Sequence, residues 1–193
     1  MGNKNRRELF FKVLKQNVIK EEMGEFVKED SPVSYSLIED DELMVFAQSF
    51  VNAKGRFVYC ENEQDFILKL KSLIEYRKWE NIFAFSEDLD LYLRDKAIET
   101  TSDSEKAIVG ISLCQALIAN SGSVLVTSKQ GFGETVNKLP SIFIVVAHSL
   151  QLYHNYKEAL EQLLENIPQS ITTFMPSEAL KQSVVEFYLY VIE

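Results

Sequence analysis

The expected fold is decided by residues 107–146, which read AIVGISLCQALIANSGSVLVTSKQGFGETVNKLPSIFIVV. Three runs in and around this stretch are continuously apolar: AIVGI at 107–111, SVLVTS at 123–128 and SIFIVVAH at 141–148. Continuous apolar runs of this length are typical of strands that are buried on both faces, as in parallel sheets. A mostly parallel sheet is therefore expected at the centre of the molecule.

Strand and helix signals alternate through the rest of the chain. Further strands are expected at 56–60, 81–85, 169–174 and 186–193, and helices at 5–20, 40–53, 62–74, 86–93 and 154–166. This alternation predicts an α/β fold of three layers, with helices on both faces of the sheet and N-terminal helices before it. We expect a single domain over 1–193, in which a helical segment, 1–54, packs on an α/β core, 55–193.

Composition excludes several classes of function. The 193 residues have a net charge of −9, which disfavours binding to a phosphate backbone, so no nucleic-acid partner is expected. No apolar run approaches the roughly 20 residues that span a bilayer, and the N-terminus lacks the apolar core of a signal peptide. A cytoplasmic protein without a membrane span is therefore expected.

A metal centre in this chain is not expected either. Cys60 and Cys114 form no C-x-x-C motif, and two cysteines alone cannot hold an iron–sulfur cluster or a structural zinc ion. His148 and His154 have no cysteine or acidic pair at metal-ligand spacing beside them. The sequence therefore predicts no metal ligand and no cofactor bound by this chain.

A turn with two hydroxyls precedes the run at 123–128. It consists of Asn120, Ser121, Gly122 and Ser123. Hydroxyls and backbone N–H groups in a tight turn are suited to holding a carboxylate or phosphate, and glycine lets the backbone approach a ligand closely. A strand-initiating turn, in which the glycine only supplies a positive φ, explains the same residues.

The connection after this run is a second candidate. Lys129, Gly131 and Gly133 could cradle a phosphate, but the spacing is not that of a Walker motif. A flexible, solvated loop remains the alternative, because surface loops concentrate glycine and charge.

The order of these pieces resembles the LUD domain, the lactate-utilisation protein C family. The likeness is carried by Ala116–Ala119, Ser121-Gly122-Ser123, Val124–Thr127, Leu139-Pro140 and Ile142–Val146. The resemblance implies a fold like that of glucosamine-6-phosphate deaminase, ribose-5-phosphate isomerase and the coenzyme A transferases (NagB/RpiA/CoA transferase-like). It also implies that 116–119 ends a helix, and that the protein is a subunit in the oxidation of L-lactate to pyruvate, with iron–sulfur clusters on partner subunits.

Several positions depart from the family pattern. Asn120 stands where the family commonly has Glu or Asp, Phe143 where it has His, and Met175 where it has the glycine of Gly-Pro-Ser. Ser177 keeps the serine of that motif and is a further candidate for anion binding, whereas the family's His-Gly-Pro loop is missing after Val185.

Two hypotheses follow from the resemblance and its departures. In the first, the chain binds a small anion and docks onto iron–sulfur lactate-oxidation subunits. In the second, it is a non-catalytic interaction or structural module with a degenerate pocket. A transferase or isomerase activity ranks below both, and whether the chain is an enzyme stays open. Aromatic residues on the last strand (Phe187, Tyr188 and Tyr190) leave a homo-oligomer open as well.

Overall fold

The structure is a computed structural model that describes residues 41–131, 139–164, 166–180 and 183–193. The helix expected at 5–20 and the candidate Gly133 lie outside these residues. The packing of the whole 1–54 segment on the core therefore stays a prediction.

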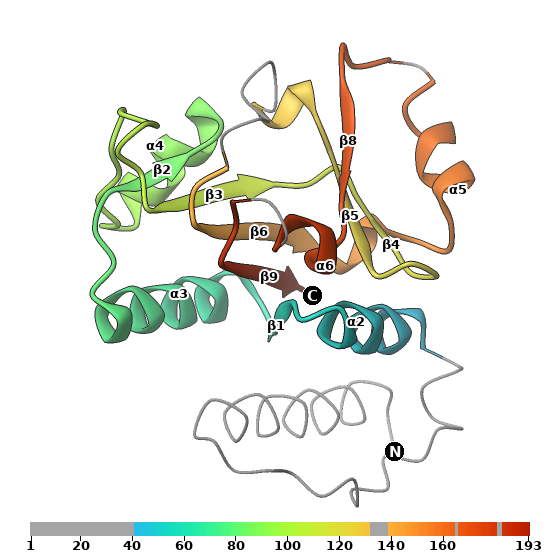
Figure 1. The fold of residues 1–193 in the computed structure, drawn as a ribbon, viewed down its shortest axis with the longest axis horizontal. Helices are drawn as coiled ribbons and strands as arrows, with labels where there is room; N and C mark the ends of the chain where they lie inside the picture. The colour runs from blue at the N-terminus through green and yellow to red at the C-terminus, as the bar shows by residue number, and fades with distance from the viewer. Residues whose placement is uncertain (1–40, 132–138, 165, 181–182) are drawn as a thin grey trace, which may run out of the picture.

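A parallel sheet of five strands forms the centre of the fold (Figure 1). Its order is β1 (Arg56–Cys60), β9 (Glu186–Ile192), β6 (Ile142–His148), β3 (Val109–Leu113) and β2 (Ile82–Ala84). All neighbouring pairs run parallel, which confirms the α/β class and the parallel sheet expected from the continuous apolar runs. Strand β6 does not alternate between buried and exposed side chains, because Ile142 to Ala147 are all buried.

Helices cover one face of this sheet. They are α3 (Glu63–Arg77) and α4 (Glu87–Asp95), which pack on the face that carries Ile144 and Tyr190. Asn62 caps α3, because its Oδ1 accepts a hydrogen bond from the Asp65 N–H at 2.9 Å. Ser86 is the N-cap residue of α4, but its side chain makes no capping hydrogen bond.

A second, mixed sheet lies on the other side, together with α2 (Glu42–Asn52) and α6 (Pro176–Ala179). Its order is β7 (Leu152–Tyr153), β4 (Ala116–Ile118), β5 (Ser123–Thr127) and β8 (Ile171–Phe174). The sequence predicted a helix end at 116–119, and this was wrong: Ala116 to Ile118 form β4, antiparallel to β5. All three side chains are buried, so the run has no polar face to distinguish a strand from a helix.

The two sheets share an aromatic core. Phe143 of the parallel sheet contacts Phe174 of the mixed sheet, with 5.5 Å between ring centroids, and Phe187 of the neighbouring strand at 5.1 Å. On its outer face the mixed sheet is covered by α5 (Tyr156–Glu161), which is shorter than the helix expected at 154–166. Phe187, Tyr188 and Tyr190 are buried on a central strand, so they do not form an exposed interface.

A carboxylate is held between two arginines where β9 begins. Glu186 pairs with Arg77 at the end of α3 and with Arg56, whose Nε lies 3.5 Å from Glu186 Oε2. The Tyr188 hydroxyl donates to the same carboxylate at 2.5 Å. Burial, and then this hydrogen bond, raise the pKa of Tyr188 to about 12. This cluster ties the ends of α3, β1 and β9 together.

The raised pKa of Tyr188 predicts a loss of stability in alkali. Its ordinary value is 10.0. Between pH 10 and 12 the unfolded chain therefore gives up this proton while the folded chain keeps it, so stability is complete below about pH 10 and falls as the pH rises towards 12. We expect a loss of up to about 2 kcal/mol in urea unfolding measured across this range. The slope should be smaller in Tyr188→Phe, and an equal slope in both proteins would contradict this assignment.

Candidate functional site

The carboxyl edge of the parallel sheet has the topology of a ligand site. The connections after β1 and β2 contain α3 and α4, which pack on one face, whereas the chain after β3 passes into the mixed sheet on the other face. The neighbouring strands β2 and β3 thus send their connections to opposite faces. In open α/β sheets ligands bind in the crevice at such a point, outside the carboxyl ends of the strands.

The turn after β5 lies against this point. It comprises the 3-10 helix η2 (Ser128–Gln130) and Gly131, which has a φ of 83°. A Cβ on Gly131 would lie 1.8 Å from the carbonyl oxygen of Phe85, the residue that follows β2. Only glycine allows this approach, so Gly131 is needed to bring Lys129 and Gln130 to the carboxyl edge of the sheet.

Glutamine side chains fix the backbone here. Gln130 Oε1 accepts hydrogen bonds from the N–H and the hydroxyl of Thr127, both at 2.8 Å, and its Nε2 lies 3.4 Å from Gln115 Oε1. Gln151 Nε2 donates to the Cys114 carbonyl at 2.8 Å, and its Oε1 accepts from the His148 N–H at 2.7 Å. The segment that follows β3 is therefore held from both sides by amide groups.

Sequence reasoning missed these three glutamines. An isolated glutamine belongs to no motif, and the only signal was position, since Gln115 and Gln151 each follow a parallel strand by a few residues. Lys129, which the sequence did single out, is exposed, and its ammonium group donates to the Asn166 carbonyl at 2.7 Å. The Nε2 groups of Gln130 and Gln151 donate within the protein, so a small anion at this edge of the sheet would meet the amide of Gln115 and the cation of Lys129.

The turn at 120–123 lies elsewhere. It joins β4 to β5, at the end of β5 opposite Lys129 and Gly131, so the structure does not bring the two groups of candidates into one site. Gly122 has a φ of 61°, and a Cβ there would lie 2.7 Å from Ser49 Cβ and 2.9 Å from the Phe50 nitrogen of α2. The glycine therefore supplies a positive φ and also lets the hairpin pack against the helix.

The donors of this turn have partners within the protein. Ser121 Oγ lies 2.5 Å from Ser123 Oγ, which lies 2.8 Å from the Tyr156 hydroxyl, and Ser123 is fully buried. The N–H groups of Ser121 and Gly122 both donate to the Ile118 carbonyl. This geometry favours a structural role for the hairpin, in which its hydroxyls attach β5 to α5.

Removing the buried hydroxyl should therefore destabilise the fold. We expect Ser123→Ala to lower the free energy of unfolding by about 1–2 kcal/mol, since it removes a buried hydrogen bond and leaves Tyr156 without that partner. Tyr156→Phe should lower the free energy of unfolding by less in the Ser123→Ala protein than in the wild type. A double-mutant cycle measured by urea unfolding would show this difference. Additive losses from the two changes would mean that the bond contributes nothing.

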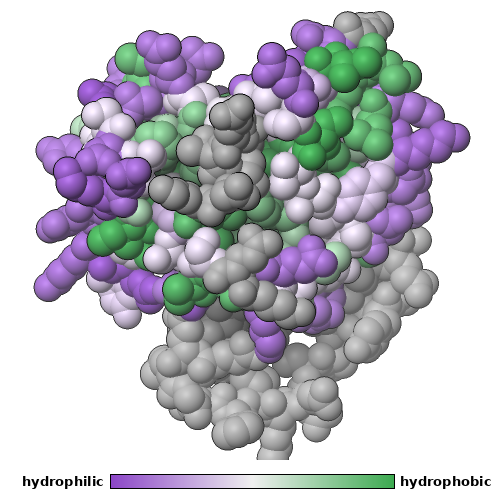
Figure 2. Space-filling view, turned by 45° about the horizontal axis from the view of Figure 1, so that its top comes forward, coloured by the Kyte–Doolittle hydropathy of each residue, from purple (hydrophilic) through white to green (hydrophobic). Residues whose placement is uncertain are grey.

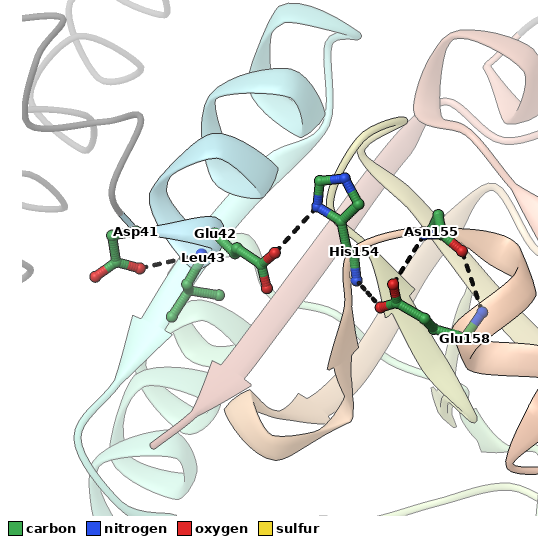
Figure 3. Close-up of polar contacts among 6 residues, drawn as sticks. All are labelled: Asp41, Glu42, Leu43, His154, Asn155 and Glu158. Atoms are coloured by element: carbon green, nitrogen blue, oxygen red, sulfur yellow. Dashed lines mark hydrogen bonds and ion pairs between the residues drawn. The ribbon is translucent and has the colours of Figure 1, made fainter.

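A polar link joins this hairpin region to α2, as Figure 3 shows. His154 Nδ1 lies 3.0 Å from Glu42 Oε1 at the start of the helix, and the His154 N–H donates to Glu158 Oε2 at 3.1 Å. Asn155 caps α5 by accepting from the Glu158 N–H. Both members of the His154–Glu42 pair are more than half exposed, so the link is a surface contact of small expected energy.

The remaining candidate, Ser177, belongs to neither group. It lies inside α6, whose N-cap residue is Met175. Within the described ranges, no three His, Cys, Asp or Glu side chains are arranged to hold a metal ion. Burial raises the pKa of Cys114 to about 12, which leaves this thiol protonated and unreactive at neutral pH. None of the helices in the part that the structure describes is long and apolar enough to cross a membrane.

Comparison with known proteins gives matches in one family. Residues 37–179 match the family described as LUD domain. A lactate utilization protein C from Bacillus subtilis is 28% identical over 78 residues, which is 40% of this chain and 32% of that protein. Its namesake from Oceanobacillus iheyensis is 29% identical over 91 residues, or 46% of this chain and 39% of that protein. The matched part thus spans about a third of the first relative and about two fifths of the second.

A solved structure shares the fold. The crystal structure of a DUF162 family protein from Deinococcus radiodurans superposes with a TM-score of 0.59, over 79% of this chain and 96% of that one. Only 11% of the residues are identical, so the likeness supports the architecture and says nothing of a ligand.

Proposed function

Because the chain belongs to the LUD domain family, we propose that it takes part in lactate utilisation, the process for which its two relatives are named. The observation that carries this proposal is the family match, which covers α2, the parallel sheet up to β6 and the whole mixed sheet. In this role the chain would serve in the oxidation of L-lactate to pyruvate beside partner subunits that carry iron–sulfur clusters. It would act as a binding subunit in the cytoplasm.

The ligand of this subunit would be a small carboxylate at the carboxyl edge of the parallel sheet. Lys129 supplies a positive charge there, and Gln115 supplies an amide that faces the turn. The position after β3 and beside β2 supports this placement, because connections diverge to opposite faces at that point. The hairpin at 120–123 remains a second place for an anion, although its donors already have internal partners.

Growth on lactate tests the role of the protein. Deleting the gene from its own organism should slow growth on L-lactate and leave growth on glucose unchanged, and a plasmid copy should restore it. Equal growth of the deletion strain on both carbon sources would refute a role in lactate utilisation.

Titration of the purified protein tests the ligand. L-lactate or pyruvate should raise the melting temperature in a saturable way, and Lys129→Ala should weaken this effect. Lys157→Ala is the matched control, because Lys157 is an exposed lysine on α5, away from the carboxyl edge. A thermal shift that is equal in both variants would place the ligand elsewhere.

A non-catalytic module is the second candidate function. It is favoured by the hydrogen bonds that Ser121, Ser123 and Tyr156 make with one another, because these bonds engage the hydroxyls within the protein. Under this alternative the purified protein gives no shift with any small anion, yet the deletion strain still grows slowly on lactate. Under the binding-subunit proposal the two effects occur together, so the pair of experiments separates the candidates.

A further inference from the structure

Among the described residues, one edge of the mixed sheet is formed by the short strand β8. Within the ranges that the structure describes, the sheet ends at β8, which pairs with β5 only. Edge strands commonly carry charges or prolines that prevent pairing with another chain. The sequence of β8 is Ile-Thr-Thr-Phe, with neither a charge nor a proline.

The hydrogen-bond register shows which groups of β8 face outward. The Ser128 N–H donates to the Ser170 carbonyl, so these two residues form a hydrogen-bonded pair between the strands. Such pairs alternate along an antiparallel ladder, which places Thr172 and Phe174 in bonded pairs with β5. The backbone N–H and C=O groups of Ile171 and Thr173 therefore point away from β5.

Exposed apolar side chains accompany this edge. Figure 2 shows hydrophobic residues gathered on the side of the molecule where β8 and α5 lie, and hydrophilic ones on the side of α4. The exposed apolar residues of this part are Leu160, Leu164, Ile167 and Ile171, of which Ile167 is 73% and Leu164 is 69% exposed. Apolar side chains that gather beside a free strand edge are typical of a protein interface.

Charge decides which partner fits. The chain has a net charge of −9, yet no Asp, Glu, Lys or Arg occurs from 107 to 128 or from 166 to 177, so β4, β5 and β8 are uncharged. Two copies of this acidic chain repel each other over most of their surfaces. At the β8 edge, two copies can approach without bringing the carboxylates of one chain close to those of the other, because this edge has no charged residue.

We propose that two copies of this chain form a dimer by antiparallel pairing of their β8 strands. A two-fold axis at Thr172 pairs Ile171 of each copy with Thr173 of the other, which matches the outward groups of one strand to those of its partner. The pairing joins the two mixed sheets into one. The exposed apolar side chains that precede β8 then lie beside the contact between the two strands. There the apolar side chains of each copy can cover those of the other copy.

Light scattering coupled to gel filtration tests this dimer on the full chain. The wild type should have a mass twice the 22.2 kDa of one chain at high concentration, and should dissociate on dilution. Added salt should favour the dimer, because it screens the repulsion between the acidic chains and the contact contains no ion pair. A monomer at every concentration would overturn the proposal and leave this edge to another partner.

Two substitutions locate the contact. Thr173→Pro removes an N–H that points away from β5, so the ladder within the sheet keeps its bonds while pairing between copies is lost. Ile171→Lys places a positive charge from each copy at the contact between the two β8 strands. It is the test variant if Thr173→Pro does not fold. Both should be monomeric with an unchanged circular dichroism spectrum. Leu68→Lys on α3, whose leucine is 66% exposed, is the matched control and should stay dimeric. A folded Ile171→Lys protein that still forms the wild-type dimer would refute β8 pairing.

Discussion

Replacing Phe143 by alanine is expected to lower the free energy of unfolding by about 3–5 kcal/mol. Phe143 is fully buried at the centre of the core that joins the two sheets. Its ring centroid lies 5.9 Å from that of Phe85, 5.5 Å from that of Phe174 and 5.1 Å from that of Phe187. Truncation leaves a cavity among three rings that belong to different strands or strand ends, and these cannot all move inward to fill it.

Urea unfolding of three variants tests this expectation. Phe143→Leu keeps most of the volume and should lose much less stability than Phe143→Ala. Ile108→Ala is a control for the loss of apolar surface, because this side chain is 49% exposed beside β3. A loss below about 1 kcal/mol for Phe143→Ala would show that the sheets do not depend on this contact.

The same position explains one departure from the family pattern. A histidine at 143 would place two ring nitrogens among aromatic rings, and a buried polar group without a partner is destabilising. We therefore expect Phe143→His to be less stable than the wild type, with the larger loss at low pH, where the imidazole would have to carry a charge.

The fold class could be predicted from the sequence because its strongest signals are local. Continuous apolar runs predicted β1, β3, β5, β6 and β9, and the helix expected at 62–74 is α3. The division of the strands between two sheets could not be predicted, since pairing depends on contacts between residues far apart in the chain. No residue in β4 or β5 indicates which sheet it joins.

The glycine after α2 does not supply the left-handed residue at the end of this helix. The residue with a positive φ there is Lys54, at 72°. Gly55 is required by space instead, because a Cβ there would lie 2.2 Å from the Phe50 ring. The sequence shows that a glycine occurs, whereas the structure is needed to tell backbone freedom from close packing.

The candidate site was predictable only in part. Glycines at 122 and 131 marked two places where the backbone has a positive φ, and both lie in turns, as expected. The separation of these turns by the length of β5 follows from the hairpin, which the sequence did not predict. The glutamines at the carboxyl edge carried no motif, so their role became visible only from their hydrogen bonds.

Replacing Gln130 by leucine should have the largest effect at the carboxyl edge, with a loss of roughly 2–5 kcal/mol. Its Oε1 is the acceptor for both the N–H and the hydroxyl of Thr127, which is fully buried. Leucine has a similar volume but no acceptor, so two buried donors lose their partner while the packing changes little. The turn that carries Lys129 and Gly131 then loses its attachment to the end of β5.

Gln130→Glu is the matched control, because a carboxylate offers the same acceptor oxygen to both Thr127 donors. It should keep most of the stability that Gln130→Leu loses in urea unfolding, and should keep it in acid as well, because the carbonyl oxygen of a protonated carboxyl group still accepts hydrogen bonds. Hydrogen exchange should report the same contrast at the Thr127 amide, which opens faster in the leucine variant alone. If both variants unfold at the wild-type urea concentration, the turn is held by Gly131 and its contact with Phe85 instead, and the amide network is a consequence of that contact.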